Sequence, residues 1–557
     1  MVLSLEEVAK HNKKDDCWVI IHDKAYDLSD FLDEHPGGPA IILKYAGKDA
    51  TTAFDPIHPG DTLKKYLAPE YHKGEVEKRK AQPKKKVIKK PSQPTPEETK
   101  SQGAGSGNGN VVDEYDVEYD EQDDKEPIPV PSSGGAAASE EVLLDEDGEP
   151  LSKEEVARLK RIENKPDLSQ MYNLNDFEFV ARHTMEKTAW GYYSSGCEDE
   201  ISMRENHLAY HRVFFRPRVM VDVRNVDFST TMLGTKTSVP FYVTATALGR
   251  LGHPDGEKVL TRACAREDVI QMIPTLASCS FDEIVDQATD KQTQWFQLYV
   301  NANKEITKQL VQHAEARGCK GLFITVDAPQ LGRREKDMRT KEFEGVSHVQ
   351  GDEDEENAVR NQGAARAIST FIDAGLNWND LKFFKSITKL PIIIKGVQCV
   401  EDALKAAELG CQGIVLSNHG GRQLEFSPAP IEILIELMPI LRARGIDQSF
   451  EVFVDGGVRR ASDILKAIAL GAKGVGIGRP FLYAMSTYGD NGVVRAMQIL
   501  KDELEMNMRF LGVTSLDQLT PDYVDVRNFG NRFVPEDKLF REVYQPMISP
   551  PFKDAKL

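Results

Sequence analysis

The chain of 557 residues contains no uninterrupted apolar run near the roughly 18 residues that a membrane-spanning helix needs, so we predict no membrane span. It also lacks an excess of basic residues, since its formal net charge is -18. Binding to nucleic-acid phosphates requires basic patches, so this charge argues against a nucleic-acid partner and favours a basic protein partner.

Cysteine is scarce and has no pattern. The seven residues show no CxxC or other metal-binding spacing, and they are Cys17, Cys197, Cys264, Cys279, Cys319, Cys399 and Cys411. This usage favours free thiols in a reducing intracellular compartment over a disulfide framework.

The N-terminus has neither the apolar core of a secretory signal nor the Arg-rich composition of a mitochondrial presequence, so we expect that a leader is absent or has been removed. The chain ends in Ala555-Lys556-Leu557, close to the SKL-type peroxisomal signal, so we expect a soluble cytoplasmic or peroxisomal protein.

Composition divides the chain into ordered and low-complexity parts. Residues 1–80 contain the strand-like CWVII at 17–21, whereas residues 81–165 join a lysine-rich run to Gly/Ser-rich and acidic segments. Such a composition cannot bury enough apolar surface to offset the loss of chain entropy. We therefore predict a disordered, flexible linker over residues 81–165.

From residue 166 onward, eight short apolar runs alternate with segments of helical periodicity. They are FYVTATA (241–247), VIQMIPT (269–275), TQWFQLYV (293–300), GLFITVDAP (321–329), PIIIKGV (391–397), GIVLSNHG (413–420), EVFVDGGV (451–458) and GVGIGRP (474–480). Continuous apolar strands that alternate with helices indicate a parallel sheet, and eight such units predict an α/β fold, a (β/α)8 TIM barrel. A doubly wound open sheet is the alternative. We assign residues 166–540 to this domain and 541–557 to a C-terminal tail.

Most of these runs end in polar residues. They are Thr246, Gln297, Tyr299, Thr325, Asp327, Lys395, Ser417, His419, Asp455, Arg459 and Arg479. In a barrel the C-terminal strand ends meet at one mouth, where active sites are built. The interval at 342–363 is unusually long for a barrel loop, and we expect it to be mobile.

Two glycine-rich strand ends predict a phosphate site. DGGVR (455–459) and GIGRP (476–480) lack the spacing of a Rossmann motif, which argues against NAD. Loops after the seventh and eighth strands of a barrel frequently bind phosphate through backbone N–H groups, and here each adds an arginine. Tight barrel turns would explain the glycines but not the arginines.

Lys395 is a cation in an apolar run, and either a reduced flavin ring or a structural salt bridge would supply its counter-charge.

Two histidines near the N-terminus lie beside Pro and Gly, His35 in EHPGG and His58 in FDPIHPG. HPGG alone would be read as a surface turn. Together with the upstream DDCWVIIHDKAYDLSDFL (15–32), however, residues 1–80 resemble a cytochrome b5 domain, a small α+β unit. The resemblance implies haem b with His35 and His58 as the axial iron ligands, a site suited to one-electron transfer.

The barrel region resembles the FMN-dependent 2-hydroxy-acid-oxidising family, which includes glycolate oxidase and flavocytochrome b2. The motifs that carry this resemblance are WGYYSSG (190–196), TATA (244–247), QLYV (297–300), TVDAP (325–329), LGRREKD (331–337), IIKGV (393–397), SNHGGRQ (417–423), DGGVRR (455–460) and GIGRP. A b5-like unit followed by this barrel resembles the architecture of flavocytochrome b2. The resemblance implies FMN as the flavin, a homotetramer, L-lactate or a similar 2-hydroxy acid as substrate, and cytochrome c as electron acceptor.

The resemblance also implies roles for individual residues. His419 would take a proton from the substrate, and Asp327 would stabilise the resulting imidazolium, so we expect Asp327 to raise the pKa of His419. Arg422 and Tyr192 would bind the substrate carboxylate with Arg334 nearby, Tyr299 would contact the substrate hydroxyl, and Lys395 would lie at the flavin. The implied flavin contacts are Ala245, Thr246, Ala247, Gln297, Thr325, Lys395, Ser417, Asp455, Gly456, Gly457, Arg459, Gly478 and Arg479.

Three further positions bear on specificity and on the flavin. Leu276 and Ala247 would flank the substrate side chain, and a medium aliphatic residue at 276, where glycolate oxidases carry a bulky aromatic, favours L-lactate over glycolate. Pro274 stands where family members usually have a serine near the flavin, so one hydrogen bond would be missing.

We therefore predict an L-lactate dehydrogenase that passes electrons from FMN through haem b to cytochrome c. A linker of about 80 residues has a span on the order of 50 Å, which would let the haem domain move. Two alternatives are an oxidase that reduces oxygen to hydrogen peroxide and a non-catalytic haem-binding electron carrier. The resemblance adds the mitochondrial intermembrane space as an alternative compartment.

Overall fold

The computed structural model describes residues 2–32, 39–54, 62–63, 67, 69–77, 151–340, 371–527 and 529–530. Several predictions lie outside these residues, namely the haem ligands His35 and His58, the 342–363 interval, most of the linker and the tail from residue 541.

The N-terminal part forms a small sheet with short helices. Its five strands follow the order β1-β5-β4-β3-β2, with β1 Val2–Leu3, β2 Asn12–Lys13, β3 Asp16–Ile21, β4 Lys24–Asp27 and β5 His72–Val76. The helical segments are α1 Leu5–Val8, η1 Ser29–Phe31, α2 Pro39–Leu43, α3 Thr51–Phe54 and η2 Pro69–Tyr71. His22 and Asp23 join β3 to β4 with φ values of 53° and 59°, which is the backbone twist that a two-residue hairpin requires. The strand predicted at 17–21 is confirmed.

The linker prediction is wrong at its C-terminal end. Residues Lys153–Glu163 form helix α5, whose first turn is capped by a hydrogen bond from the Glu155 N–H to the Ser152 hydroxyl. Arg158 and Arg161 of this helix donate to the carbonyls of Thr184 and His183 at the C-terminal end of helix α6. Those carbonyls have no partner within their own helix, so a cation there is stabilising. Because α5 buries no side chain of its own, its composition resembles that of a linker.

The eight predicted strands are confirmed, and they close into a parallel barrel in chain order. They are β9 Phe241–Val243, β10 Ile270–Ile273, β11 Gln294–Leu298, β12 Leu322–Thr325, β13 Ile392–Val397, β14 Gly413–Leu416, β15 Glu451–Asp455 and β16 Gly474–Ile477. The barrel closes where Val475 of β16 pairs with Phe241 of β9. Both faces of each strand are buried, one in the barrel interior and one under helices, which is why the strands are continuously apolar. The open-sheet alternative is excluded.

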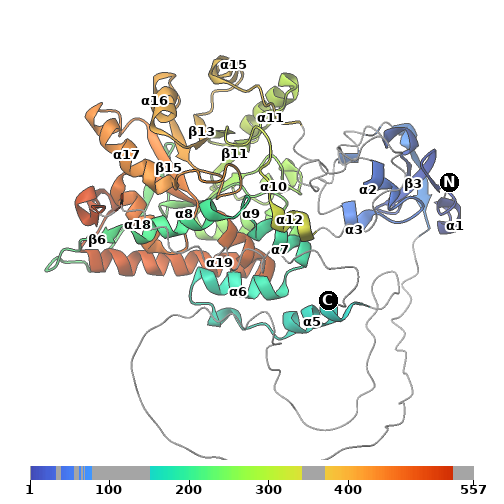
Figure 1. Cartoon of the computed structure of the whole chain (residues 1–557), viewed down its shortest axis with the longest axis horizontal. Coiled ribbons are helices and arrows are strands. Elements are labelled where there is room, and N and C mark those ends of the chain that lie inside the picture. The colour runs from blue at the N-terminus through green and yellow to red at the C-terminus, as the bar shows by residue number, and fades with distance from the viewer. Residues whose placement is uncertain are drawn as a thin grey trace, which may run out of the picture. The chain divides into compact units, whose positions relative to one another are not determined.

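Helices surround the barrel, and others come between residue 151 and its first strand (Figure 1). Those before it are α5, α6 Leu174–Thr184, α7 Lys187–Ser194 and α8 Ile201–His211; those within and after it are α9 Glu257–Glu267, α10 Phe281–Val285, α11 Lys304–Ala316, α12 Glu335–Thr340, α15 Leu381–Ile387, α16 Val400–Glu408, α17 Pro430–Ala443, α18 Ala461–Leu470 and α19 Arg479–Leu511. Helix α19 is interrupted at Gly489, which has φ 59° and ψ -143°, and it packs against α6 and α9.

The N-terminal end of the barrel is filled by aromatic side chains and a hairpin. Tyr242, Trp295, Phe323 and Phe453 pack against one another in the interior. The hairpin of β7 Thr230–Met232 and β8 Thr235–Thr237 packs against these aromatic side chains through Met232 and Leu233. A separate two-stranded sheet is formed by β6 Phe214–Phe215 and β17 Val524–Asp525. In the part of the chain that the structure describes, these side chains fill this end of the barrel, and the pocket lies at the opposite, C-terminal mouth.

Candidate active site

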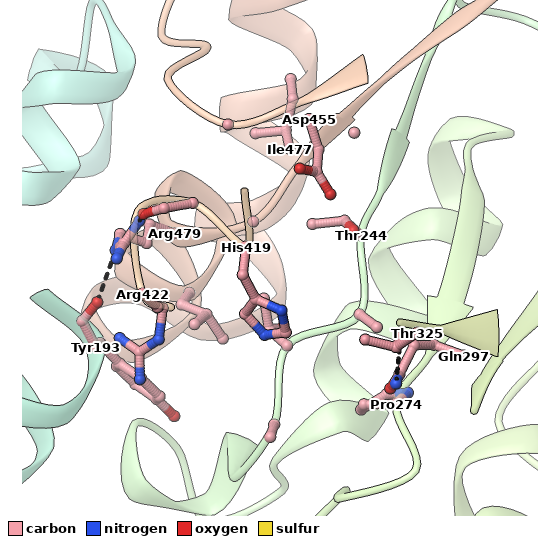
Figure 2. Close-up of a pocket in the computed structure, with 18 of the residues that line it drawn as sticks. Tyr193, Thr244, Pro274, Gln297, Thr325, His419, Arg422, Asp455, Ile477 and Arg479 are labelled. Atoms are coloured by element: carbon pink, nitrogen blue, oxygen red, sulfur yellow. Dashed lines mark hydrogen bonds between the residues drawn. The ribbon is translucent and has the colours of Figure 1, made fainter. Parts of the chain in front are cut away.

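A large pocket occupies the C-terminal mouth of the barrel, as the polar strand ends predicted. The empty space inside it, counted together with the solvent at its opening, is about 1180 Å³, and its lining combines apolar side chains with converging polar groups, as ligand sites do. Figure 2 shows His419 in this pocket with Arg422 and Arg479 on one side and Thr325, Gln297 and Pro274 on the other. The predicted site residues that line the pocket are Tyr192, Ala245, Thr246, Ala247, Leu276, Gln297, Tyr299, Thr325, Arg334, Lys395, His419, Arg422, Asp455, Gly456, Gly457, Arg459, Gly478 and Arg479.

His419 lies between a carboxylate and a phenol. Its Nδ1 atom is 2.9 Å from Asp327 Oδ1, and its Nε2 atom is 3.1 Å from the Tyr299 hydroxyl. An ionised carboxylate can only accept hydrogen bonds, so in the neutral ring the proton resides on Nδ1. The lone pair of Nε2 consequently faces the pocket, where it can accept a proton.

The backbone around His419 is unusual and tightly supported. His419, Gly420 and Gly421 all have positive φ, at 60°, 63° and 73°. Such a conformation is strained for histidine and persists only where its surroundings hold it. The Ser417 hydroxyl accepts a hydrogen bond from the His419 N–H, and the Asn418 side chain accepts one from Gly421.

The second glycine of the motif is required by packing. A Cβ atom on Gly421 would lie 2.4 Å from the backbone of Met203 in α8, which is closer than real Cβ contacts. The SNHGG sequence therefore specifies a loop that fits between strand β14 and helix α8.

Asp327 raises the pKa of His419 as expected, but the net shift of that pKa has the opposite direction. Burial lowers the pKa of His419, the Asp327 carboxylate raises it, and the nearby cations Lys395 and Arg334 lower it further, so the net pKa lies below the usual 6.5. Burial alone would raise the pKa of Asp327, but His419 and Lys395 outweigh burial and hold it below its usual value. The site thus combines an ionised Asp327 with a neutral imidazole that is ready to accept a proton.

Two arginines, the buried Arg334 and the partly buried Arg422, make the same pocket attractive to anions. Burial and the neighbouring Arg422 lower the pKa of Arg334 to about 10. Arg422 donates to the carbonyls of Tyr192 and Ser195, and its guanidinium lies 4.9 Å from the centre of the Tyr192 ring. Among the residues that the structure describes, no carboxylate forms a salt bridge with either arginine. Their positive charge is consequently available to an anionic ligand.

Lys395 has a protein counter-charge, which supports the salt-bridge interpretation of its sequence. Its Nζ atom lies 3.4 Å from Asp455 Oδ2, and both side chains are buried. Burial lowers the pKa of Lys395, but Asp455 and Asp327 raise it by more, so the lysine is protonated. A cation thus lies at the floor of the pocket, where it can also contact a flavin ring.

The pocket has the features that a bound FMN needs. Three buried side-chain oxygens that line it, Thr244 Oγ1, Thr246 Oγ1 and Asp455 Oδ1, have no partner in the structure, which a polar ligand would supply. Gly456 and Gly457, which also line the pocket, have φ values of 92° and 81°, a left-handed conformation that favours glycine. A Cβ atom on Gly457 would lie 2.1 Å from the Asn206 carbonyl oxygen, so packing against helix α8 also requires glycine there.

The two arginines predicted to hold the phosphate have other contacts. Arg459 lies 3.4 Å from Glu178 Oε2. Arg479 donates to the carbonyls of Tyr193, Gly420 and Ser195, so its guanidinium joins three segments of chain. Its predicted contact with phosphate therefore stays a prediction, because these three carbonyls already explain why an arginine stands at this strand end.

Two predicted site residues lie behind the pocket instead of on its surface. Asp327 and Ser417 are buried and act on His419 through the hydrogen bonds given above. Conversely, the pocket is lined by Tyr193, Thr244, Leu248, Leu331, Val458, Ile477 and Leu482, which the sequence analysis did not select. Thr244 and Tyr193 lie within the quoted TATA and WGYYSSG motifs, whereas the apolar residues carry no signal that separates them from core.

Comparisons with known proteins agree with this geometry. Residues 181–526 match the family model for FMN-dependent dehydrogenase, and residues 4–77 match that for the cytochrome b5-like heme/steroid binding domain. The chain belongs to the FMN-dependent dehydrogenase family. It is 52% identical over 99% of its length to the L-lactate dehydrogenase (cytochrome) of Wickerhamomyces anomalus and 48% identical over 99% to that of Saccharomyces cerevisiae, in each case covering 85% of the relative.

The solved structures give the same result. The flavin-binding domain of baker's yeast flavocytochrome b2 is 53% identical, with a TM-score of 0.63 that covers 72% of this chain and 100% of that one. With its b5-like domain, the chain groups with flavocytochrome b2 within the family. The two domains imply FMN and haem as cofactors. None of the described helices has the length and apolar character needed to cross a membrane.

Proposed function

We propose that this protein oxidises L-lactate to pyruvate and transfers the electrons from FMN through haem b to cytochrome c. The observation that carries the proposal is the set of groups in one pocket. They are a neutral histidine base held by Asp327, a buried Arg334 and a partly buried Arg422, and neither arginine forms a salt bridge with a carboxylate of the described residues. This set matches a small anion that carries a hydroxyl next to its carboxylate. The names of the relatives support the same substrate and acceptor class.

The substrate carboxylate binds to Arg422, with Tyr192 and Arg334 beside it. A guanidinium binds a carboxylate through two parallel hydrogen bonds, which fixes the orientation of the substrate as well as its position. The pocket wall beyond this anchor contains Ala247 and Leu276. These side chains leave room for the methyl group of lactate.

The substrate hydroxyl lies between Tyr299 and His419. In the structure the Tyr299 hydroxyl is 3.1 Å from Nε2, and a substrate hydroxyl that enters this space takes over one of the two partners. His419 accepts a proton from the substrate at Nε2, and Asp327 stabilises the charged ring through Nδ1.

FMN, when bound in this pocket, would supply a two-electron acceptor for the substrate. We assign its polar contacts to Thr246, Gln297, Thr325 and Lys395 and its phosphate to the glycines at 456, 457 and 478 with Arg459. Pro274 lines the pocket but has neither a hydroxyl nor an N–H to donate, so it could not supply a hydrogen bond to the flavin there.

Cytochrome c is the acceptor that we propose, in a homotetrameric enzyme. The net charge of -18 suits a basic acceptor because opposite charges accelerate the encounter of the two proteins.

We propose His35 and His58 as the haem iron ligands. Co-fractionation with cytochrome c, with catalase or with soluble cytoplasmic markers separates the three compartments that the sequence allows.

Anaerobic stopped-flow mixing with L-lactate tests the proposal. We expect the flavin absorbance to bleach and the haem to become reduced afterwards, and added cytochrome c to reoxidise both. A haem that stays oxidised while lactate is consumed would refute this electron route.

Rapid production of hydrogen peroxide in air would instead support an oxidase, the activity named for relatives such as the peroxisomal (S)-2-hydroxyacid oxidases of Arabidopsis thaliana. His419→Gln should abolish lactate turnover while FMN remains bound, which would exclude a non-catalytic electron carrier.

A further inference from the structure

Glu257, the first residue of helix α9, is fully buried and carries four hydrogen bonds on its carboxylate. Oε1 accepts from the N–H groups of Gly249 at 2.8 Å and Ser278 at 3.0 Å. Oε2 accepts from the Ser278 hydroxyl at 2.9 Å and the Cys279 N–H at 3.1 Å. No salt bridge among the described residues includes Glu257, so these donors alone compensate its burial.

The four donors belong to two different loops that both reach the substrate pocket. Gly249 follows strand β9 and comes two residues after Ala247, whereas Ser278 follows strand β10 and comes two residues after Leu276. Ala247 and Leu276 both line the pocket that contains His419. The carboxylate of Glu257 therefore ties together the two segments that form one wall of the pocket.

Other contacts show how closely these loops fit around the carboxylate. A Cβ atom on Gly249 would lie 2.8 Å from the Glu257 backbone nitrogen and 2.9 Å from its Cδ. The two loops also touch directly, since the Leu248 N–H donates to the Leu276 carbonyl and the Arg250 N–H donates to the Ser278 hydroxyl.

The segment beside Ala247 needs such support. Leu248 has φ 58°, a left-handed conformation that is strained for a leucine. Its carbonyl accepts a 2.6 Å hydrogen bond from Tyr193, the neighbour of the substrate-binding candidate Tyr192. Without the bonds to Glu257, the backbone at 248–250 could relax toward an ordinary conformation and carry Ala247 away from Leu276.

We propose that Glu257 is a positioning residue that sets the width of the pocket around the substrate side chain and thereby favours 2-hydroxy acids with small side chains. This inference rests on the proposed function, because it concerns the specificity of the same site. Glu257 does not touch the substrate; it acts through Ala247 and Leu276.

The test compares kcat/KM for L-lactate with that for L-2-hydroxy-4-methylpentanoate in the full-length holoenzyme, with ferricyanide as acceptor. The ratio of the two values does not depend on the fraction of active enzyme, so partial misfolding cannot imitate a change in specificity. For Glu257→Ala we expect the ratio to shift toward the larger acid by about tenfold, the discrimination that a small change in an apolar pocket provides.

Conservative and control variants define what this shift means. In Glu257→Gln the amide oxygen can replace Oε1 and keep the bridge between Gly249 and Ser278, so we expect most of the wild-type ratio to return. Glu315 on α11 also accepts hydrogen bonds from a hydroxyl and an N–H, those of Thr388 and Lys389, but these residues precede strand β13 at the other end of the barrel. Glu315→Ala should leave the ratio unchanged.

Each outcome decides the proposal. An unchanged ratio in Glu257→Ala, with both activities reduced equally, would overturn it and leave Glu257 a purely structural residue. If Glu257→Ala does not fold, Ser278→Ala is measured in its place, because it removes one of the four hydrogen bonds to Glu257. A shift of the ratio toward the larger acid, smaller than the tenfold expected for Glu257→Ala, supports the proposal. An unchanged ratio overturns it. A wild-type enzyme that oxidises neither acid would refute the proposed function itself.

Discussion

Asn206 of helix α8 and Asn418, the residue before His419, exchange two side-chain hydrogen bonds of 2.7 Å each. Both amides are almost completely buried. Asn418 also accepts from the Gly421 N–H, so the pair fixes the left-handed loop that carries His419.

Asn206→Leu should therefore reduce turnover although Asn206 is not part of the pocket lining. The substitution leaves the buried Asn418 amide without its main partner, at a cost of about 1–3 kcal/mol. We expect kcat for L-lactate to fall by roughly tenfold or more and the Tm to decrease. Asn491, an exposed residue whose side chain bonds Arg266, is the control, and Asn491→Ala should change neither value. A normal kcat in Asn206→Leu would show that the loop keeps its conformation without the pair.

The pH dependence of the reaction should report the lowered pKa of His419. The base is active only when neutral, so kcat/KM is lost as the pH falls through that pKa. Because burial together with Lys395 and Arg334 outweighs the effect of Asp327, we expect the acidic limb of the kcat/KM profile below pH 6.5. A limb well above 6.5 in the free enzyme would contradict this balance of charges.

Asp327→Asn should change both the rate and the position of that limb. The carboxylate raises the pKa of His419, so its removal should shift the acidic limb to still lower pH. The amide also fails to stabilise the charged ring, and we expect kcat/KM to fall by about 10²-fold or more. Steady-state profiles of wild type and variant, measured with one acceptor, show both effects. A slower enzyme with an unshifted limb would assign the titration to another group.

The buried pair of Lys395 and Asp455 makes a prediction about stability. Lys395→Met leaves the Asp455 carboxylate buried without its cation, which typically costs about 3–5 kcal/mol. We expect a large decrease in Tm and in FMN content for the single variant. The double variant Lys395→Met/Asp455→Leu should recover much of the Tm, because no uncompensated charge remains, but not the FMN content. Equal Tm values for the single and double variants would argue against a direct coupling.

The sequence by itself predicted the barrel because its strands are buried on both faces. That environment requires continuous apolar runs, and eight of them alternate with helical segments in chain order. The sequence also predicted where the candidate site residues lie, since the C-terminal ends of parallel strands must meet at one mouth and most of the polar strand ends line the pocket found there. Local signals were therefore sufficient for the topology and the location of the site.

Only the tertiary structure decided how these residues act on one another. Asp327 and His419 are 92 residues apart in the chain, and the pKa of His419 depends on burial and on cations from two other segments, which no local pattern records. Glu257 looks like an ordinary acidic residue at the start of a helix, and helix α5 resembles the linker before it. Hydrogen bonds and electrostatic interactions depend on distance in space, so a sequence can nominate the participating groups, but the fold determines which of them meet.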